Sequence, residues 1–184
     1  MKRWSMKVWV AALIVAGLQT SALAYMVLNR ANLIAEGREI VLDVRPVDPR
    51  SLFRGDYVIL GYGNISRLDK ELLKDIGKRR DSMQVFVTLK KGDEGWQPTS
   101  VTKRYPANVA ADEVVLNGRL PNRFAHRVTY GIEAFFVPEG EGKELEKLIR
   151  AGQLKAIVAV GSDGTAALKG LEVEGERRYD QPLF

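Results

Sequence analysis

The stretch Val8–Leu28, VWVAALIVAGLQTSALAYMVL, decides how this chain is organised. It contains no charged residue, and apart from Gln19, Thr20 and Ser21 it is apolar. At 1.5 Å per residue, a helix of this length spans about 31 Å, which is close to the thickness of the hydrocarbon layer of a bilayer. The stretch therefore predicts one transmembrane helix, with residues 8–28 in contact with the lipid bilayer.

The residues before this stretch indicate its orientation. Lys2, Arg3 and Lys7 precede it, and the first 29 residues contain no acidic side chain. Lys and Arg accumulate on the cytoplasmic side of membrane proteins. We therefore expect a single-pass protein of the inner (cytoplasmic) membrane, with a cytoplasmic N-terminus and a periplasmic, or otherwise extracytoplasmic, C-terminal domain.

A cleaved signal peptide is the alternative to an uncleaved signal-anchor. Ala22-Leu23-Ala24 has the small-x-small pattern that precedes a cleavage site. However, the apolar run is long for a signal peptide, and it continues to Leu28, so cleavage after Ala24 would leave an apolar new N-terminus. We favour an anchor over residues 1–29, and both interpretations place residues 30–184 outside the cytoplasm.

Composition excludes several classes of protein. Hydrophobic residues make up 46% and charged residues 28% of the 184, which is typical of a globular domain and argues against disorder. The absence of cysteine excludes disulfides and thiolate metal sites, and His126 is the one histidine, so we expect no metal and no cofactor. Without the three basic residues at the N-terminus, the excess of basic side chains falls from +5 to +2. No basic stripe with interleaved aromatic residues remains, and we expect no nucleic-acid partner.

The remaining sequence is patterned mainly as strands. Ile40, Leu42 and Val44 alternate with charged residues, as in a half-buried strand. The predicted strands are 39–45, 56–62, 85–89, 96–105, 114–120, 128–137, 154–160 and 165–173. Helices are predicted over 69–78 and 143–151, and the polar tail from Glu174 is expected to fray. Because helices and strands do not alternate, the fold class is α+β: an N-terminal transmembrane helix, then a single β-rich, mainly antiparallel domain with two short helices.

One octapeptide identifies a family. Residues 55–62 read GDYVILGY, and this matches every fixed position of the motif for which the GDYXXLXY family is named. The resemblance extends over most of the chain beyond the anchor, through DPR at 48–50, LFR at 52–54, YGIE at 130–133 and FVPEG at 136–140. It implies a membrane-anchored bacterial protein of uncharacterised role. Members tend to be encoded beside multi-pass membrane proteins, and the resemblance transfers no activity, substrate or cofactor.

The motif has a structural interpretation. Gly55 stands where a turn enters a strand, and Asp56 can accept hydrogen bonds from backbone donors of that turn. Leu60 and Tyr62 share one face of the strand, towards the core, whereas Tyr57 points to the other face. On this interpretation the octapeptide is a corner that the fold requires.

The functional interpretation is a binding surface around the motif. Arg50, Arg54, Asp56 and Tyr57 would line it, since Arg binds carboxylate and phosphate through two parallel hydrogen bonds. Glu133 stands within an apolar run and must be solvated or paired with a cation, for which Arg45, Arg50 and Arg54 are the candidates. The full set of motif and surface residues is Arg50, Arg54, Gly55, Asp56, Tyr57, Leu60, Tyr62, Glu133 and Glu139.

No catalytic residue is predicted. The sequence lacks a Gly-x-Ser-x-Gly elbow and a Gly-x-x-x-x-Gly-Lys phosphate loop. Residues 52–58 are similar to the stretch that follows the nucleophile of signal peptidases, but Val47-Asp48 precedes Pro49 where those enzymes need serine. We therefore expect a non-enzymatic accessory or binding protein that acts with a multi-pass membrane partner. The alternative is an envelope hydrolase or small-ligand-binding domain with a site around the motif.

Overall fold

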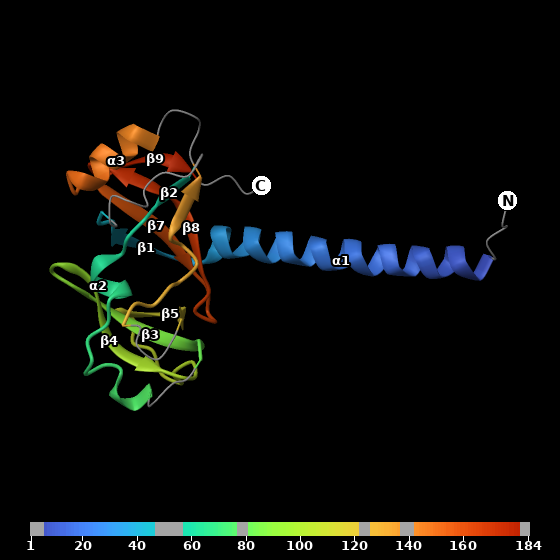
Figure 1. Ribbon diagram of the computed structural model, residues 1–184, viewed down its shortest axis with the longest axis horizontal. Helices are drawn as coiled ribbons and strands as arrows, with labels where there is room; N and C mark the ends of the chain where they lie inside the picture. Colours follow the sequence, from blue (N-terminus) through green and yellow to red (C-terminus); the bar gives the residue numbers. More distant parts are fainter. Residues whose placement is uncertain (1–5, 47–56, 77–80, 122–125, 137–141, 181–184) are drawn as a thin grey trace.

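A computed structural model gives the fold of the chain. It describes residues 6–46, 57–76, 81–121, 126–136 and 142–180. A long helix, α1, projects from a β-rich domain as a single rod (Figure 1). The structure confirms the predicted class, an apolar helix followed by mainly antiparallel sheets with a few short helices.

The helix α1 runs from Met6 to Glu36 and is 31 residues long. All of its residues from Lys7 to Arg30 are exposed, including large apolar ones such as Leu13, which is 72% exposed. It is long and apolar enough to cross a membrane, and none of its most apolar part is buried against the domain. A core helix of a soluble protein buries its apolar face, so this exposure argues against that role.

The C-terminal end of α1 is attached to the domain without a linker. The prediction ended the apolar helix at Leu28, whereas the observed helix continues to Glu36. In these last turns Leu33 and Ile34 are half-buried, and α1 contacts β7 and β8 of the domain. The N–H of Gly37 donates to the carbonyl of Leu33 (3.0 Å), and the first strand begins at the next residue. A Cβ at Gly37 would overlap that carbonyl, which explains the glycine at the junction.

Over its described residues, the domain contains three antiparallel sheets and three short helices. The four-stranded sheet has the order β1-β7-β8-β9, with β1 Arg38–Asp43, β7 Leu154–Val160, β8 Ala166–Val173 and β9 Glu176–Asp180. The three-stranded sheet has the order β4-β3-β5, with β3 Met83–Gly92, β4 Gly95–Thr102 and β5 Glu113–Leu120. The smallest sheet pairs β2, Tyr57–Ile59, with β6, Ala134–Phe136. The helices are α2 Gly63–Ser66, the 3₁₀ turn η1 Lys74–Ile76, and α3 Gly142–Arg150.

Two segments, 57–68 and 126–136, link the larger sheets. The first segment pairs with the residues just after β1 through an isolated bridge between Arg45 and Gly61. The second segment pairs with β5 through a bridge between Arg119 and Thr129. The backbone bonds of this path include Arg45 N–H to Gly61 O (2.7 Å), Leu60 N–H to Glu133 O (2.8 Å) and Arg119 N–H to Thr129 O (2.8 Å). Backbone hydrogen bonds therefore connect all three sheets.

One core serves the whole domain. Each sheet contributes side chains that are almost fully buried, among them Leu171, Leu89 and Phe135. The two linking segments add Val58, Leu60, Tyr62, Ile65 and Val128. Val58, Leu60 and Tyr62 share the buried side, as their period-2 spacing predicted.

Most of the predicted strands are confirmed, and so is the helix over 143–151. The polar tail was predicted wrongly, because residues 176–180 form β9 and pair with β8. Here Leu171 pairs with Tyr179, and Tyr179 packs against the core. The strands β8 and β9 form a hairpin joined by Glu174 and Gly175, whose φ angles of 53° and 89° are both positive. The charged residues of β9 lack the apolar alternation by which the other strands were predicted.

Three further predictions need correction. The described part of the helix predicted over 69–78, residues 69–76, is a turn followed by η1. The N–H of Leu68 is bonded to the carbonyl of His126, and the short segment that follows cannot sustain a helix alone. The strand over 128–137 is reduced to β6, since Gly131 has a positive φ of 79° that interrupts it. The strand over 56–62 ends at Ile59 and gives way to α2.

Replacing Gly170 tests how β9 is held. A Cβ at Gly170 would overlap the carbonyl oxygen of Tyr179, so Gly170→Ala should force β9 away from β8. We expect the free energy of unfolding to fall by about 1–3 kcal/mol, the usual cost of overpacking. Urea unfolding of the full chain in mild detergent, followed by circular dichroism, measures it. Gly92→Ala is the control, because its nearest neighbour would lie 3.7 Å away; equal stability of the two variants would contradict the prediction.

Candidate functional site

The structure places only part of the predicted site. Arg50, Arg54, Gly55, Asp56 and Glu139 lie outside the described residues, and so does the side chain of Tyr57. Leu60, Tyr62 and Glu133 are described, and they lie together where the linking segments 57–68 and 126–136 meet. The candidate site is therefore built from these three residues outward.

Tyr62 fastens the end of the motif to the opposite segment. Its side chain is only 2% exposed, and its hydroxyl donates to the carbonyl of Ile132 at 2.7 Å. Burial, and then the nearby charge of Glu133, raise the pKa of Tyr62 well above its ordinary value. The hydroxyl is therefore kept as a neutral hydrogen-bond donor. This supports the structural interpretation of this part of the motif.

Glu133 is held by the backbone beside it. Its carboxylate accepts hydrogen bonds from the N–H groups of Tyr130 (2.5 Å) and Gly131 (2.9 Å). The left-handed conformation of Gly131 belongs to this tight turn. The half-buried carboxylate is thus satisfied by two amide donors, an arrangement that the sequence analysis did not consider. Tyr130 donates its own hydroxyl to Ile65 O (2.6 Å), and burial followed by the charge of Glu133 raises its pKa.

A groove of about 470 Å³ runs over the outside of this corner. We call it the motif groove. The residues that define it are the motif residues 59–62, with Arg45, Gly63, Arg67, Arg127, Thr129 and Glu133. Arg45 is one of the predicted partners of Glu133, whereas Arg67 and Arg127 were not predicted, because only the folding of two distant segments brings them side by side.

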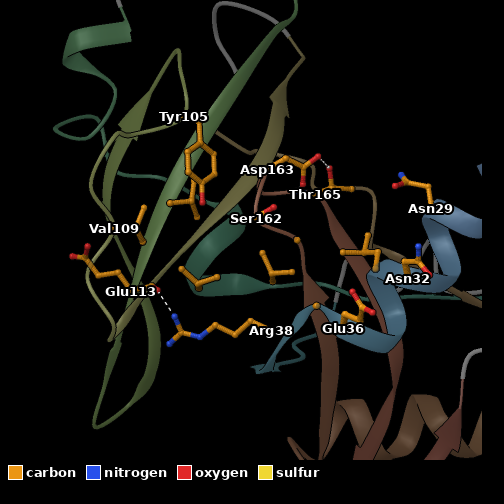
Figure 2. Close-up of a pocket in the computed structure, with 16 residues that line it drawn as sticks. Asn29, Asn32, Glu36, Arg38, Tyr105, Val109, Glu113, Ser162, Asp163 and Thr165 are labelled. Atoms are coloured by element: carbon orange, nitrogen blue, oxygen red, sulfur yellow. Dashed lines mark hydrogen bonds between the residues drawn. The ribbon is translucent and has the colours of Figure 1, made fainter.

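A second groove, of about 650 Å³, lies where α1 joins the domain, and we call it the junction groove (Figure 2). The end of α1 forms one side with Asn29, Asn32 and Glu36. Tyr105, Val109 and Glu113 line the opposite side, and Ser162, Asp163 and Thr165 of the β7–β8 turn lie between them. The spacing of 29, 32 and 36 places those side chains on one face of the helix, and this was the signal in the sequence that could have indicated the groove.

Polar contacts hold the junction groove in shape. The Arg38 guanidinium donates to the carbonyls of Glu113 and Ala111, both at 2.7 Å, and lies over the ring of Trp96. Asp163 accepts from the hydroxyl (2.7 Å) and the N–H (2.9 Å) of Thr165. These hydrogen bonds, the hydroxyl first, lower the pKa of Asp163. The groove therefore presents ordered carbonyl, amide and carboxylate groups of the kind that bind a polar segment through hydrogen bonds.

Among the described residues, no three His, Asp or Glu side chains lie close enough together to hold a metal ion. His126, the one histidine, is exposed, and its carbonyl is engaged by the N–H of Leu68. Both grooves present hydrogen-bonding and charged groups.

The family model described as GDYXXLXY protein matches residues 19–171. The chain belongs to the GDYXXLXY family. No curated protein and no solved structure matches it. The match begins within α1 and ends in β8, so it includes the lining of both grooves. In this GDYXXLXY domain, the two described fixed positions at the end of the motif, Leu60 and Tyr62, are buried and shape the inner wall of the motif groove.

Removing the Tyr62 hydroxyl should weaken the domain. Tyr62→Phe keeps the ring but leaves the buried carbonyl of Ile132 without this donor. We expect the free energy of unfolding to fall by about 1–2 kcal/mol. Urea unfolding in mild detergent measures the change, with Tyr105→Phe, at a 39% exposed side chain, as the control. If both variants were as stable as the wild type, the hydroxyl would not fasten the corner.

The pKa of Asp163 gives a test of the junction groove. Because its folded-state pKa is lowered, the associated stabilisation is complete above the ordinary value of about 3.9 and is lost as the pH falls through the folded-state pKa. We expect the Asp163 carboxyl to titrate below that ordinary value in carbon-13 NMR. Thr165→Val should move the midpoint upward, since it removes the hydroxyl that contributes most to the shift. Thr129→Val, whose hydroxyl bonds Arg119 O instead, should leave it unchanged; an Asp163 midpoint unmoved by Thr165→Val would refute the assignment.

Proposed function

We propose that this protein is a single-pass, membrane-anchored accessory or binding protein whose β-rich domain acts outside the cytoplasm beside a multi-pass membrane partner. One observation carries the proposal: a helix that is exposed from Lys7 to Arg30 passes into a folded domain with only Gly37 between helix and strand. Such a helix is stable in lipid and not in water.

The length of α1 sets the distance between domain and bilayer. The apolar part, residues 8–28, accounts for about 31 Å at 1.5 Å per residue, which fills the hydrocarbon layer. Residues 29–36 add about 12 Å, enough to cross a headgroup layer of roughly 6 Å. In this arrangement the domain rests at the membrane surface, and the junction groove faces that surface.

The exposure of the end of the apolar stretch supports an uncleaved anchor. Cleavage after Ala24 would leave Tyr25, Met26 and Leu28 at a new N-terminus, where they are 71%, 66% and 61% exposed. If these side chains lie in lipid, their apolar surface does not have to be buried against the protein. The basic residues Lys2, Arg3 and Lys7 would remain in the cytoplasm by the positive-inside rule. Residues 1–29 are accordingly proposed as the anchor, and residues 30–184 as the extracytoplasmic domain.

The junction groove supports a partner in the same membrane. It opens beside the point where α1 leaves the domain (Figure 2), so the extracytoplasmic loop of a neighbouring transmembrane protein can reach it. Its lining mixes the amides of Asn29 and Asn32 with apolar surface from Leu33 and Val109. A wet, partly polar contact of this kind is common between proteins that associate reversibly.

Two measurements test the proposal. Alkaline phosphatase fused to the C-terminus should be active, because the enzyme folds only outside the cytoplasm. A photo-cross-linking residue at Asn32 or Ser162 should capture a multi-pass membrane protein that also co-purifies in mild detergent. The same residue at Asp93, in the exposed β3–β4 turn and outside the groove, is the control. An inactive phosphatase, or capture that is equal at the control position, would overturn the proposal.

A small-ligand-binding domain is the second candidate, and the motif groove favours it. The groove combines a ligand-sized volume with several charged side chains. In the described residues, nothing favours hydrolysis over binding.

A further inference from the structure

We propose that the motif groove binds the phosphate or carboxylate group of a small soluble molecule, through Arg45, Arg67 and Arg127. This names the ligand class for the second candidate function, and it rests on the proposed membrane anchor only for the choice of a soluble ligand over a lipid headgroup. All three arginines line the groove, and all three are exposed.

Arg67 and Arg127 are directly opposite each other in an isolated antiparallel bridge. The flanking bonds run from Leu68 N–H to His126 O (2.8 Å) and from Val128 N–H to Ser66 O (2.7 Å). These bonds make the two arginines a non-hydrogen-bonded pair, in which the Cα atoms are only about 4.5 Å apart and the side chains leave on the same face. Like charges in such a pair repel each other, and an anion held between the two guanidinium groups would remove that repulsion.

Arg45 reaches the groove from the residues that follow β1. Its N–H is bonded to Gly61 O (2.7 Å), and its side chain crosses α2 at Gly63. A Cβ at position 63 would lie 2.7 Å from Cδ of Arg45 and 3.3 Å from its Nε. The missing side chain at Gly63 therefore provides the space that Arg45 occupies.

The charge of the groove is left uncompensated. Glu133 is the acidic side chain in its lining, and its two carboxylate oxygens already accept hydrogen bonds from backbone N–H groups. None of the three arginines forms an ion pair with another residue that the structure describes. The described lining thus has three positive charges and one negative charge. The Arg guanidinium group suits a phosphate or carboxylate, because its N–H groups match two oxygens of the anion at once.

The position of the groove argues for a soluble molecule. The helix α2, which forms part of its wall, lies on the side of the domain away from the projecting length of α1 (Figure 1). A headgroup of the bilayer that holds α1 would be on the opposite side. The volume of about 470 Å³ is in the range of sites for small molecules.

Calorimetric titration of the full chain in zwitterionic nanodiscs tests this inference, with inorganic phosphate and succinate as separate probes. We expect saturable binding of at least one of them. The double variant Arg67→Gln/Arg127→Gln should weaken its binding by at least about tenfold, since two charge-assisted contacts are lost. Lys103→Gln/Arg104→Gln, an exposed pair outside the groove, removes the same charge and should bind as the wild type does.

A further variant separates binding from folding. Gly63→Ala displaces the side chain of Arg45 and should weaken binding several-fold while the melting temperature stays close to that of the wild type. The double arginine variant should melt, without ligand, at the same or a higher temperature, because a repulsive pair is gone. The inference is overturned if the wild type binds neither probe, if the double variant binds as well as the wild type, or if binding is seen only with vesicles of anionic lipid.

Discussion

The domain depends on a single hydrophobic core, to which all three small sheets contribute side chains. A two-stranded ribbon such as β2–β6 is unstable alone, and sheets of three and four strands need a second layer to bury their apolar faces. Segments 57–68 and 126–136 connect them, with backbone hydrogen bonds to Arg45, two residues after the end of β1, on one side and to β5 on the other. The motif supplies Val58, Leu60 and Tyr62 to the core at this joint.

The joint contains polar groups that are satisfied locally. Tyr62 and Tyr130 each donate a hydroxyl to a backbone carbonyl across the joint, and Glu133 accepts from two backbone N–H groups. A buried polar group without a partner costs roughly 1–3 kcal/mol, so these contacts specify one arrangement of the two segments. On the outer side of the joint, charged side chains of the two segments line the motif groove. The inner side of the joint belongs to the core.

The two grooves lie in different parts of the molecule. The junction groove is built by the end of α1 against the domain, so it lies at the membrane surface in the proposed arrangement. The motif groove is built by the linking segments and α2, away from the projecting helix. One protein held at a membrane could thus contact a neighbour in the bilayer through the first groove and a soluble anion through the second. The direct passage from α1 to β1 keeps both grooves in a set position relative to the helix.

The sequence by itself determined the apolar helix, the family, the α+β class and most strands, because hydropathy, a contiguous octapeptide and local periodicity are properties of neighbouring residues. It also indicated that Leu60 and Tyr62 face the core. It could not show that β9 pairs with β8, that Gly131 interrupts a strand, or that backbone amides hold Glu133. The meeting of Arg67 and Arg127 across 60 positions of chain required the tertiary structure, because it results from contact between distant segments. The other three features are local: β9 follows β8 after a two-residue turn, Gly131 has a positive φ, and Glu133 accepts from N–H groups two and three residues before it. They depend on backbone angles and hydrogen bonds, which hydropathy and periodicity do not record.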